Sequence, residues 1–516
     1  MKSWRNWRAN VFNHSDICLA TNPRCIGALA GTGHVQTDTR RLRSGDIFCA
    51  LRGEQHDGHA FIAEAVKTGA AAVIIDHEIE CAVPRYIVAD TLKAYQNLAA
   101  YHRNRFALPV IGVTGSNGKT TVKELIWSIL KETGSVLKNE KNFNNHIGVP
   151  LTLMKLDRTH TRAVIEMGMN HAGEIRVLSK IARPDAAVIT CIGRAHLAFL
   201  GTVDAIAAAK AEIYDGMNPG GTVILPREDT YYDWLKRAAE QAGLRVKSFS
   251  IENSADSVCR VTGMRVDGMN GVLRIGAEDA VFTTRLTGRH NACNIAAAAA
   301  AVQTVAPELQ LSDIVRVLND ISPVDMRCQV QMVNGITVIL DCYNANPDSS
   351  GAALRFLSDI TATGKKIALL GDMLELGEKT EMLHEEIGRL AAELKIDILA
   401  VLGEHSEALA AGARGAGMPR ETILKGYERR ELARLLRQIL HPGDVLLLKG
   451  SRKMKLEELL PALNGSVQAG DETREDNAFT GTRCENSPNS LHQSPTPKPN
   501  TNTNSTFGCC TSVMAP

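Results

Sequence analysis

The sequence has almost no excess of charge of either sign. Its 58 lysine and arginine residues stand against 57 aspartate and glutamate residues, a formal net charge of +1. Proteins that hold nucleic acid or an anionic membrane through their overall charge usually carry a basic excess. The balance excludes that class, so an anionic ligand must be held by a few individually placed cations.

Long apolar runs are also absent. The most apolar window, residues 296–302, is rich in alanine and falls far short of the roughly 18 apolar residues that a membrane span requires. Residues 1–12 contain charge and two tryptophans but no apolar core typical of a signal peptide. We therefore expect no membrane insertion.

A disulfide framework is the third absence. The 12 cysteines form no CxxC pair and no regular pattern, and only Cys509 and Cys510 are adjacent. In a chain of this length, such scattering indicates free thiols in a reducing compartment. We expect the protein to be cytoplasmic.

What the sequence does contain is globular composition and a repeated alternation of strands and helices. Of its 516 residues 44% are hydrophobic and 22% charged, and at roughly 150 residues per domain this length suggests three domains. Short β-branched runs alternate with helical patterns, which is typical of mostly parallel sheets covered by helices. The expected strands are 45–51, 70–76, 85–89, 110–115, 163–168, 186–193, 221–226, 336–342, 366–372, 398–403 and 444–450.

This alternation predicts an α/β protein of three domains followed by a tail. Residues 1–105 form a small α/β domain, residues 106–324 a central domain with a parallel sheet, and residues 325–465 a Rossmann-like domain. Residues 466–516 are rich in Ser, Thr, Asn and Pro and nearly devoid of aliphatic residues. Such a segment cannot bury enough surface to offset its ordering entropy, so we expect the tail to be disordered.

The sharpest motif is Gly-Val-Thr-Gly-Ser-Asn-Gly-Lys-Thr-Thr at residues 112–121, between a strand-like and a helical run. In a phosphate loop, backbone N–H groups and a helix N-terminus surround the phosphates. In this chain Lys119 would reach the β and γ oxygens, and Thr120 would contact Mg²⁺. The strict pattern has glycine where this chain has Val113, and a glycine turn that merely carries Lys-Thr is the alternative. We predict a phosphate-loop ATPase domain that binds ATP or a similar nucleotide.

Three more polar residues belong to the same predicted domain. Glu166 ends an apolar run, where phosphate-loop enzymes place a second acidic group. His196 also follows a strand, although a lone histidine there is more often a structural hydrogen-bonding residue. Lys210 lies in a helical run near Glu212, and a solvated lysine is the ordinary interpretation of that position.

Nine motifs occur in order along the chain: VTGSNGKTT, NFNNHIGVPLTL, EMGMNHAGEI, IGRAHL, AAAKAEIY, GRHNACNIAAAA, DCYNANPDS, GDMLELGE and LLLKGSRKMKLEE. Together, over about residues 35–465, they resemble the Mur ligases, ATP-dependent enzymes that form amide bonds in peptidoglycan precursor synthesis. The nucleotide loop is shared by all Mur ligases and by folylpolyglutamate synthase. NFNNHIGVP, YNANPDS and GDMLELG are similar to the member that adds D-alanyl-D-alanine.

The resemblance implies a three-domain ligase with its active site between the domains. Its substrates would be ATP, UDP-N-acetylmuramoyl-tripeptide and D-alanyl-D-alanine, with an acyl phosphate as the intermediate. Because a carboxylate and a phosphate repel each other, Mg²⁺ and a lysine would have to neutralise charge before reaction. No nucleic acid is implied as a partner, and we expect a monomer.

The resemblance also assigns roles to individual residues. The catalytic residues would be Lys119, His196, Lys210 and Arg327. The metal contacts would be Thr120, Glu166, His196 and Lys210, the last as a CO₂-derived carbamate, since carbamylation converts this cation into an anion. The ATP contacts would be Gly115, Ser116, Asn117, Gly118, Lys119, Thr120, Thr121, Asn291, Asn294, Arg327, Asp341 and Tyr343. The substrate contacts would be Thr39, Arg40, Asn144, Asn145 and Lys449.

Some of these residues also have an ordinary structural interpretation. Asp38 and Arg40 could form a surface ion pair at a turn. Asn291 and Asn294 could cap the N-terminus of the helix that contains the alanine run. The ion pair competes with the contact to uridine that the resemblance implies for Arg40. The helix cap competes with the contact to adenine that it implies for the two asparagines.

Three positions depart from the family pattern. Met326 precedes Arg327 where a glycine is usual, which bears on the geometry of domain closure. Ala198 stands where an acidic residue is common, and residues 226–230 lack the usual Asn-Ala-Asp, so no adenine contact is assigned there. None of these removes a phosphate or metal contact, so we expect activity.

Other interpretations of the sequence stay open. Another Mur step or folate polyglutamylation would keep the chemistry, although the Asp-Asn-Pro-Arg motif of the member that adds diaminopimelate or lysine is absent. A phosphate-loop switch would need an Asn-Lys-x-Asp motif, which the chain lacks, and an inactive paralogue that only binds UDP-sugar is a third alternative. The sequence leaves open the third residue of the tripeptide, the carbamylation of Lys210, the oligomeric state and the role of the tail.

Overall fold

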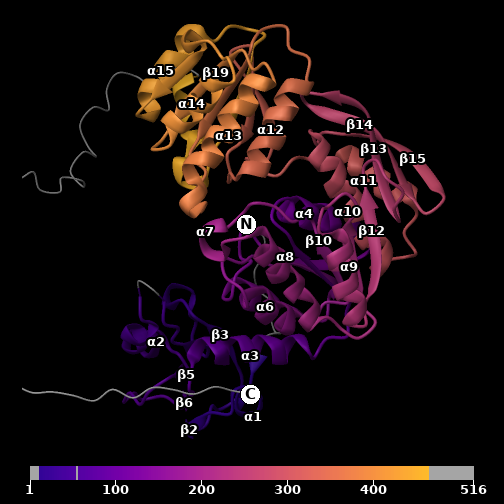
Figure 1. The fold of residues 1–516 in the computed structure, drawn as a ribbon. Helices are drawn as coiled ribbons and strands as arrows, with labels where there is room; N and C mark the ends of the chain where they lie inside the picture. Colours follow the sequence, from indigo (N-terminus) through magenta and orange to yellow (C-terminus); the bar gives the residue numbers. More distant parts are fainter. Residues whose placement is uncertain (1–10, 54–55, 464–516) are drawn as a thin grey trace, which may run out of the picture. The chain divides into compact units, whose positions relative to one another are not determined.

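The structure, a computed structural model, describes residues 11–53 and 56–463. These residues form three separate β-sheets that follow one another along the chain (Figure 1). The prediction of an α/β fold with three domains is confirmed. The domain boundaries at 105 and 325 stay predictions, and the tail at 466–516 lies outside the described residues.

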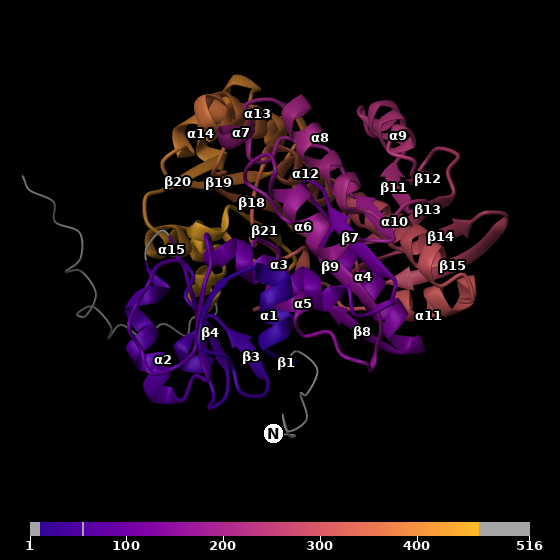
Figure 2. The same ribbon diagram turned by 90° about the horizontal axis from the view of Figure 1, so that it is seen from below.

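The first sheet has six strands in the order β1-β3-β4-β5-β6-β2, with β3 to β6 parallel and the two edge strands antiparallel to their neighbours. Alternate residues of its central strands face two different cores. Phe48 and Val73 pack with α2, whereas Cys49 and Ile74 pack with α1 and α3, so helices cover both faces (Figure 2). The elements are β1 (Val11–Phe12), α1 (His14–Thr21), β2 (Arg24–Ile26), β3 (Gly33–Gln36), β4 (Ile47–Cys49), α2 (Ile62–Thr68), β5 (Ala72–Ile75), β6 (Arg85–Ile87) and α3 (Thr91–Arg103).

The second sheet has nine strands in the order β15-β14-β13-β12-β11-β10-β7-β9-β8. Val113 and Val188 pack with α4 and α10 on one face, and Ile165 and Ile189 pack with α6 and α8 on the other. The strands are β7 (Val110–Thr114), β8 (Ser135–Lys138), β9 (His160–Glu166), β10 (Ala186–Ile189), β11 (Thr222–Pro226), β12 (Arg245–Ser250), β13 (Ser257–Arg265), β14 (Gly268–Ile275) and β15 (Glu278–Thr284). The helices are α4 (Lys119–Leu130), α5 (Gly148–Leu153), α6 (Glu174–Ala182), α7 (Leu197–Leu200), α8 (Val203–Ala211), α9 (Tyr232–Gln241), α10 (Arg289–Val305) and α11 (Leu311–Asp320).

One edge of this sheet departs from the expected parallel arrangement. Strands β7 to β13 are parallel to one another. Strands β13, β14 and β15 form an antiparallel meander and lie side by side in Figure 1. Short apolar runs do not mark these strands in the sequence, because exposed and buried residues alternate along them; Val281, for example, is 74% exposed. Such alternation is typical of a sheet with one solvated face.

The third sheet has six strands in the order β16-β17-β21-β18-β19-β20, all parallel except β16. Each expected strand of this region is present, and the edge strands β16 and β20 were not expected. The strands are β16 (Gln329–Val333), β17 (Ile336–Asp341), β18 (Lys366–Gly371), β19 (Ile398–Leu402), β20 (Ile423–Gly426) and β21 (Val445–Lys449). The helices are α12 (Pro347–Asp359), α13 (Thr380–Glu393), α14 (Ser406–Gly415), α15 (Arg429–Ile439) and α16 (Leu460–Leu463).

The alanine-rich window at 296–302 lies inside α10, and its residues are buried. Small side chains let α10 approach the sheet and α4 closely, so the run builds a core contact. In the part of the chain that the structure describes, every helix is too short or too polar to cross a membrane.

Candidate active site

A tight glycine loop joins β7 to α4. Gly115 and Gly118 have φ angles of +140° and +81°, in the region that favours glycine. A Cβ atom on Gly118 would collide with the side-chain oxygen of Asn294, and one on Gly115 with the hydroxyl of Thr190. The loop therefore has the close backbone packing that a phosphate cradle at a helix N-terminus needs.

Lys119 is the first residue of α4, and its side chain folds back over the loop. Its Nζ donates hydrogen bonds to the carbonyl oxygens of Gly115 at 2.7 Å and Ser116 at 3.2 Å. Burial lowers the pKa of Lys119 from its ordinary value. The hydroxyl of Ser116 donates in turn to the carbonyl oxygen of Gly193 at 3.0 Å, which braces the loop against the segment after β10. A cation is thus held at the loop.

Glu166, at the end of β9, is 2% exposed and is held by neutral and cationic neighbours. Its Oε1 accepts a hydrogen bond from Asn144 Nδ2 at 2.8 Å, and its Oε2 lies 3.6 Å from Lys123 Nζ. Its backbone N–H donates to Asn139 Oδ1 at 2.7 Å. Oε2 has no hydrogen-bond partner among the described residues, so this carboxylate oxygen is available to a cation.

Lys210, in α8, is fully buried, and its Nζ has no hydrogen-bond partner within residues 11–53 and 56–463. Burial, and then the nearby positive charge of Lys119, hold the pKa of Lys210 well below its usual range. The ordinary interpretation, a solvated lysine, is wrong, because tertiary packing places this helix face in the core. Within the described residues, Lys210 thus presents a buried amine without a hydrogen-bond partner.

Two asparagines of α10 extend toward the phosphate loop. Asn291 Nδ2 donates to the carbonyl oxygen of Thr287 at 2.7 Å, and Asn294 Nδ2 donates to Asn291 Oδ1 at 2.9 Å. Asn294 Oδ1 abuts Gly118. The helix is preceded by Gly288, which makes no side-chain cap, so the alternative that these asparagines cap the helix is wrong.

Arg327 connects the third domain to the loop. Its Nη2 donates to Thr120 Oγ1 at 3.0 Å, and its guanidinium carbon lies 4.3 Å from the centre of the Tyr343 ring. Met326 and Cys328 on either side have φ angles of +56° and +50°. A side chain in this left-handed conformation costs roughly 1–2 kcal/mol, which gives a physical reason for the glycine that the family usually has before this arginine.

Asp341 and Lys449 hold each other at the carboxyl ends of β17 and β21. Lys449 Nζ lies 3.1 Å from Asp341 Oδ2 and donates to the carbonyl oxygen of Asn344 at 2.6 Å. Asp341 Oδ1 accepts from the N–H of Cys328 at 3.2 Å. Lys449 is 2% exposed, so its ammonium fixes the turn that carries Tyr343 and the backbone next to Arg327.

His196 has a φ angle of +59° and pairs with a residue of the third domain. Its Nδ1 lies 2.7 Å from Glu375 Oε2, and this contact lowers the pKa of the Glu375 carboxyl. The N–H of Ala198 donates to the Glu375 carbonyl oxygen at 3.0 Å. The segment that departs from the family at Ala198 therefore still contacts the GDMLELGE motif through its backbone.

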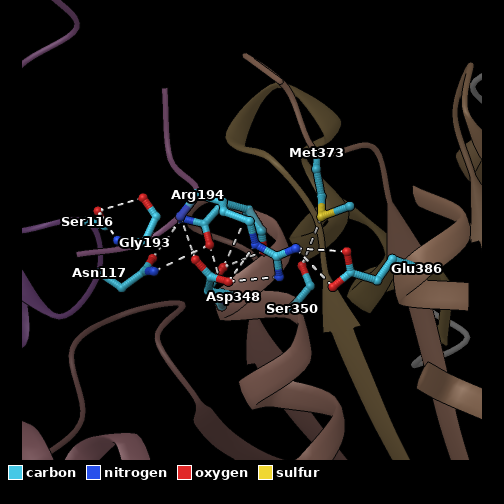
Figure 3. A network of polar contacts seen from close by, with 10 residues as sticks. Ser116, Asn117, Gly193, Arg194, Asp348, Ser350, Met373 and Glu386 are labelled. Carbon is cyan, nitrogen blue, oxygen red and sulfur yellow. Dashed lines mark hydrogen bonds and ion pairs between the residues drawn. The ribbon is translucent and has the colours of Figure 1, made fainter. Parts of the chain in front are cut away.

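Further polar contacts join the loop region to the third domain, and Arg194, Asp348 and Glu386 among them were not expected from the sequence (Figure 3). The guanidinium of Arg194 contacts Asp348 Oδ1 at 2.9 Å and Glu386 Oε2 at 2.8 Å, and its backbone N–H donates to Asp348 Oδ2 at 2.6 Å. Asn117 and Asn346 exchange amide hydrogen bonds of 2.8 and 3.4 Å. Arg194 and Asp348 lie inside the motifs IGRAHL and DCYNANPDS, which is the signal that could have identified them.

The remaining expected substrate contacts lie in two turns. Arg40 is 85% exposed on its side chain and contacts Asp38 at 2.9 Å through Nε, which is the surface ion pair that the sequence left as an alternative. Thr39 begins the same turn. Asn145 Oδ1 accepts from the N–H of Gly148 at 2.9 Å and so fixes the start of α5. Contacts of these residues with substrate stay predictions.

Models of Mur ligase domains match the chain in three consecutive segments. They are the Mur ligase family, catalytic domain (residues 33–112), the Mur ligase middle domain (113–302) and the Mur ligase, glutamate ligase domain (326–452).

Curated relatives match over most of their length. The chain is 36% identical over 435 residues to UDP-N-acetylmuramoyl-tripeptide–D-alanyl-D-alanine ligase of Bacillus subtilis, covering 83% of this chain and 92% of the relative. It is 35% identical over 457 residues to the enzyme of that name from Escherichia coli, covering 87% and 97%.

Solved structures agree with these matches. MurF from Acinetobacter baumannii superposes with a TM-score of 0.82 at 31% identity, covering 88% of this chain and 99% of that one. MurF ligase from Thermotoga maritima in complex with ADP gives a TM-score of 0.75 at 27% identity, covering 84% and 97%. With three domain models in order and relatives above 30% identity matched almost end to end, the chain belongs to the Mur ligase family.

Proposed function

We propose that the chain uses ATP to join D-alanyl-D-alanine to UDP-N-acetylmuramoyl-tripeptide, which yields the pentapeptide precursor of peptidoglycan, ADP and phosphate. The relatives named for this reaction support the choice of substrates. The observation that carries the chemistry is the contact of Arg327 with Thr120, because it brings a cation from a second domain to a phosphate loop that already holds Lys119.

In the first step, a carboxylate oxygen of the tripeptide attacks the γ-phosphorus of ATP, the bond to the β–γ bridging oxygen breaks, and ADP leaves. Both reactants are anions, so the site must supply positive charge where they meet. Lys119 exchanges its loop carbonyl partners for phosphate oxygens, and Arg327 covers the far side of the γ-phosphate. Each cation is already fixed in position, so little reorganisation accompanies the transfer.

In the second step, the amine of D-alanyl-D-alanine attacks the acyl carbon. The tetrahedral intermediate expels phosphate, and a proton from the amine passes to solvent. The same two cations stabilise the departing phosphate. Asn291 and Asn294 lie beside the loop with amide groups that can both donate and accept, which suits the edge of a purine.

Mg²⁺ fits the side chains beside the loop. Glu166 presents a buried oxygen without a hydrogen bond, and Thr120 presents a hydroxyl. The buried amine of Lys210, whose pKa is lowered by burial, can take up CO₂ with loss of a proton, giving a carbamate whose oxygens are hard ligands. These residues and His196 would hold the metal, which would supply charge neutralisation at the phosphates when bound.

We place the reaction in the cytoplasm and assign the active unit as a monomer. ATP and a UDP-sugar are both soluble nucleotides, and the residues at the loop come from one chain. Thr39 and Arg40 are proposed to hold the uridine end. Asn144, Asn145 and Lys449 are proposed to act near the peptide end, where Asn144 also orients Glu166.

The test is phosphate release from ATP by the full chain with Mg²⁺ and UDP-N-acetylmuramoyl-tripeptide, with D-alanyl-D-alanine, diaminopimelate, lysine or glutamate as the amine. Release only with D-alanyl-D-alanine, together with the pentapeptide mass, supports the proposal. Release with another amine moves the enzyme to another ligation step. Absence of release with every amine, while ATP still binds, contradicts ligase activity.

A further inference from the structure

A cluster of one histidine and two cysteines lies in the first domain, on elements that the proposed reaction does not use. His14 and Cys18 occupy α1, and Cys25 lies on the edge strand β2. Cys18 Sγ is 3.6 Å from Cys25 Sγ and 3.7 Å from His14 Nε2, and all three atoms lie within 4.8 Å of one another. His14 and Cys18 are four residues apart, so they share one face of the helix.

The spacing of these atoms corresponds to the edges of a tetrahedron around zinc. With Zn–S bonds of about 2.3 Å and Zn–N bonds of about 2.0 Å, tetrahedral angles put two sulfurs about 3.8 Å apart and a sulfur and a nitrogen about 3.5 Å apart. The separations of 3.6 and 3.7 Å lie within about 0.2 Å of these values. The third separation, between Cys25 Sγ and His14 Nε2, is at most 4.8 Å, so this pair must close by up to about 1.3 Å for one ion to bind all three atoms.

The histidine is also oriented as zinc ligands are. His14 Nδ1 lies 2.9 Å from the hydroxyl of Tyr86, which is fully buried and accepts a hydrogen bond from the N–H of Leu29 at 3.1 Å. A histidine that binds metal through Nε2 carries its proton on Nδ1 and donates it to such a partner. The phenol oxygen thus fixes the ring so that Nε2 faces the two thiols.

We propose that His14, Cys18 and Cys25 form a zinc site that ties α1 to the edge strand β2. Zn²⁺ binds the two sulfurs and Nε2, the two thiol protons pass to solvent, and water takes the fourth position because Cys25 is exposed. The site is structural: the covalent path from Cys18 to Cys25 includes the turn at Asn22, and the ion closes that turn. Nothing in the ligation chemistry depends on it.

A reactive or oxidised thiol pair is the competing possibility. Such a pair would be joined by a bond between Cys18 Sγ and Cys25 Sγ. A disulfide requires an S–S distance of about 2.05 Å, and the sulfurs are 3.6 Å apart. The geometry therefore favours a bridging ion over a bond between the sulfurs.

The test uses the full chain with the tail cysteines Cys484, Cys509 and Cys510 replaced by serine in every version, reduced and freed of metal. Co²⁺ is added as a spectroscopic probe, followed by competition with Zn²⁺. We expect thiolate-to-cobalt charge-transfer absorption that saturates at one ion per chain and disappears when Zn²⁺ is added. Cys25→Ser and His14→Gln should each weaken the affinity for Zn²⁺ by more than about tenfold.

Cys81→Ser is the matched control, because Cys81 is a half-buried thiol of the same domain whose sulfur donates a hydrogen bond to the carbonyl oxygen of Val83. It should leave the spectrum and the affinity unchanged. Equal spectra for Cys25→Ser and Cys81→Ser would overturn the proposal. So would a reduced parent chain that binds no Co²⁺, and so, separately, would a disulfide between Cys18 and Cys25 in the protein as isolated before reduction.

Discussion

Replacing Lys210 by methionine should move stability and activity in opposite directions. Methionine is unbranched, has nearly the length of the lysine stem and carries no group that needs a hydrogen bond. Lys210 is fully buried, and its Nζ lacks a hydrogen-bond partner within the described chain. Lys210→Met therefore removes an unsatisfied group without opening a cavity.

The expected gain follows from that unsatisfied amine. A buried polar group without a partner costs about 1–3 kcal/mol, and a swap that conserves volume adds little strain. In buffer depleted of CO₂ and above about pH 10.4, where the unfolded chain has largely released the proton, the free energy of unfolding should rise by about 1–3 kcal/mol. Because burial lowers the pKa of Lys210, the unfolded chain binds more protons than the folded chain below that pH, so the gain should grow as the pH falls.

Turnover should fall in the same variant, by at least about 100-fold, if Lys210 carries the proposed carbamate. The turnover of Lys210→Ala should fall by a similar factor. It should recover in part when short carboxylates such as formate or acetate are added, since these can occupy the vacated space. Stability is measured by urea unfolding with tryptophan fluorescence, because Trp127 and Trp234 lie in helices of the central domain. Turnover is measured by phosphate release.

Lys180→Met is the control, since Lys180 is exposed on α6 and should change stability by less than about 0.5 kcal/mol. If Lys210→Met instead lowers the free energy of unfolding, Lys210 must have a stabilising partner in the folded chain, and its description as unpartnered is refuted. Turnover close to that of the unmodified chain would refute its role in the metal site. The two outcomes are independent, so each part of the reasoning can fail alone.

Three further perturbations test other parts of the structure. Lys119→Ala should lower ATP turnover by about 10²–10³-fold, because it removes the cation at the phosphate loop, and near-normal phosphate release would contradict the loop assignment. In a double-mutant cycle on ATP turnover, Arg194→Ala and Asp348→Asn should couple by about 0.5–3 kcal/mol. Additive effects would mean that the contact between the two side chains does not contribute to turnover. Burial lowers the pKa of His384, whose Nε2 accepts a hydrogen bond from the N–H of Met373 at 3.0 Å. Below about pH 6.5 the unfolded chain therefore binds more protons than the folded chain, and the free energy of unfolding falls. Hydrogen exchange at Met373, corrected for its intrinsic rate, should accelerate in that range, and a rate independent of pH would contradict this.

Sequence reasoning succeeded where a feature is local. The strand, glycine loop and helix of residues 110–130 are adjacent in the chain, and glycine chemistry alone defines the turn. It failed where a partner is distant. Lys210 looked solvated because helix periodicity does not show which face the other elements of the domain will cover.

The same limit applies to the polar contacts. Asn291 looked like a helix cap, yet its amide donates to the carbonyl oxygen of Thr287, which precedes the helix. Arg194 and Asp348 are 154 residues apart, and their pairing depends on how two sheets are brought together. His14, Cys18 and Cys25 looked like scattered residues, although the helical spacing of the first two was visible.

By itself, the sequence determined the three α/β units, the phosphate loop and the family, because these depend on periodicity, on glycine conformations and on motifs in a fixed order. Only the tertiary structure decided which lysine is buried, which oxygen of Glu166 lacks a partner and which thiols face a histidine. The physical reason is that burial and charge pairing are properties of groups brought together from distant parts of the chain, and they set the protonation and availability of each side chain.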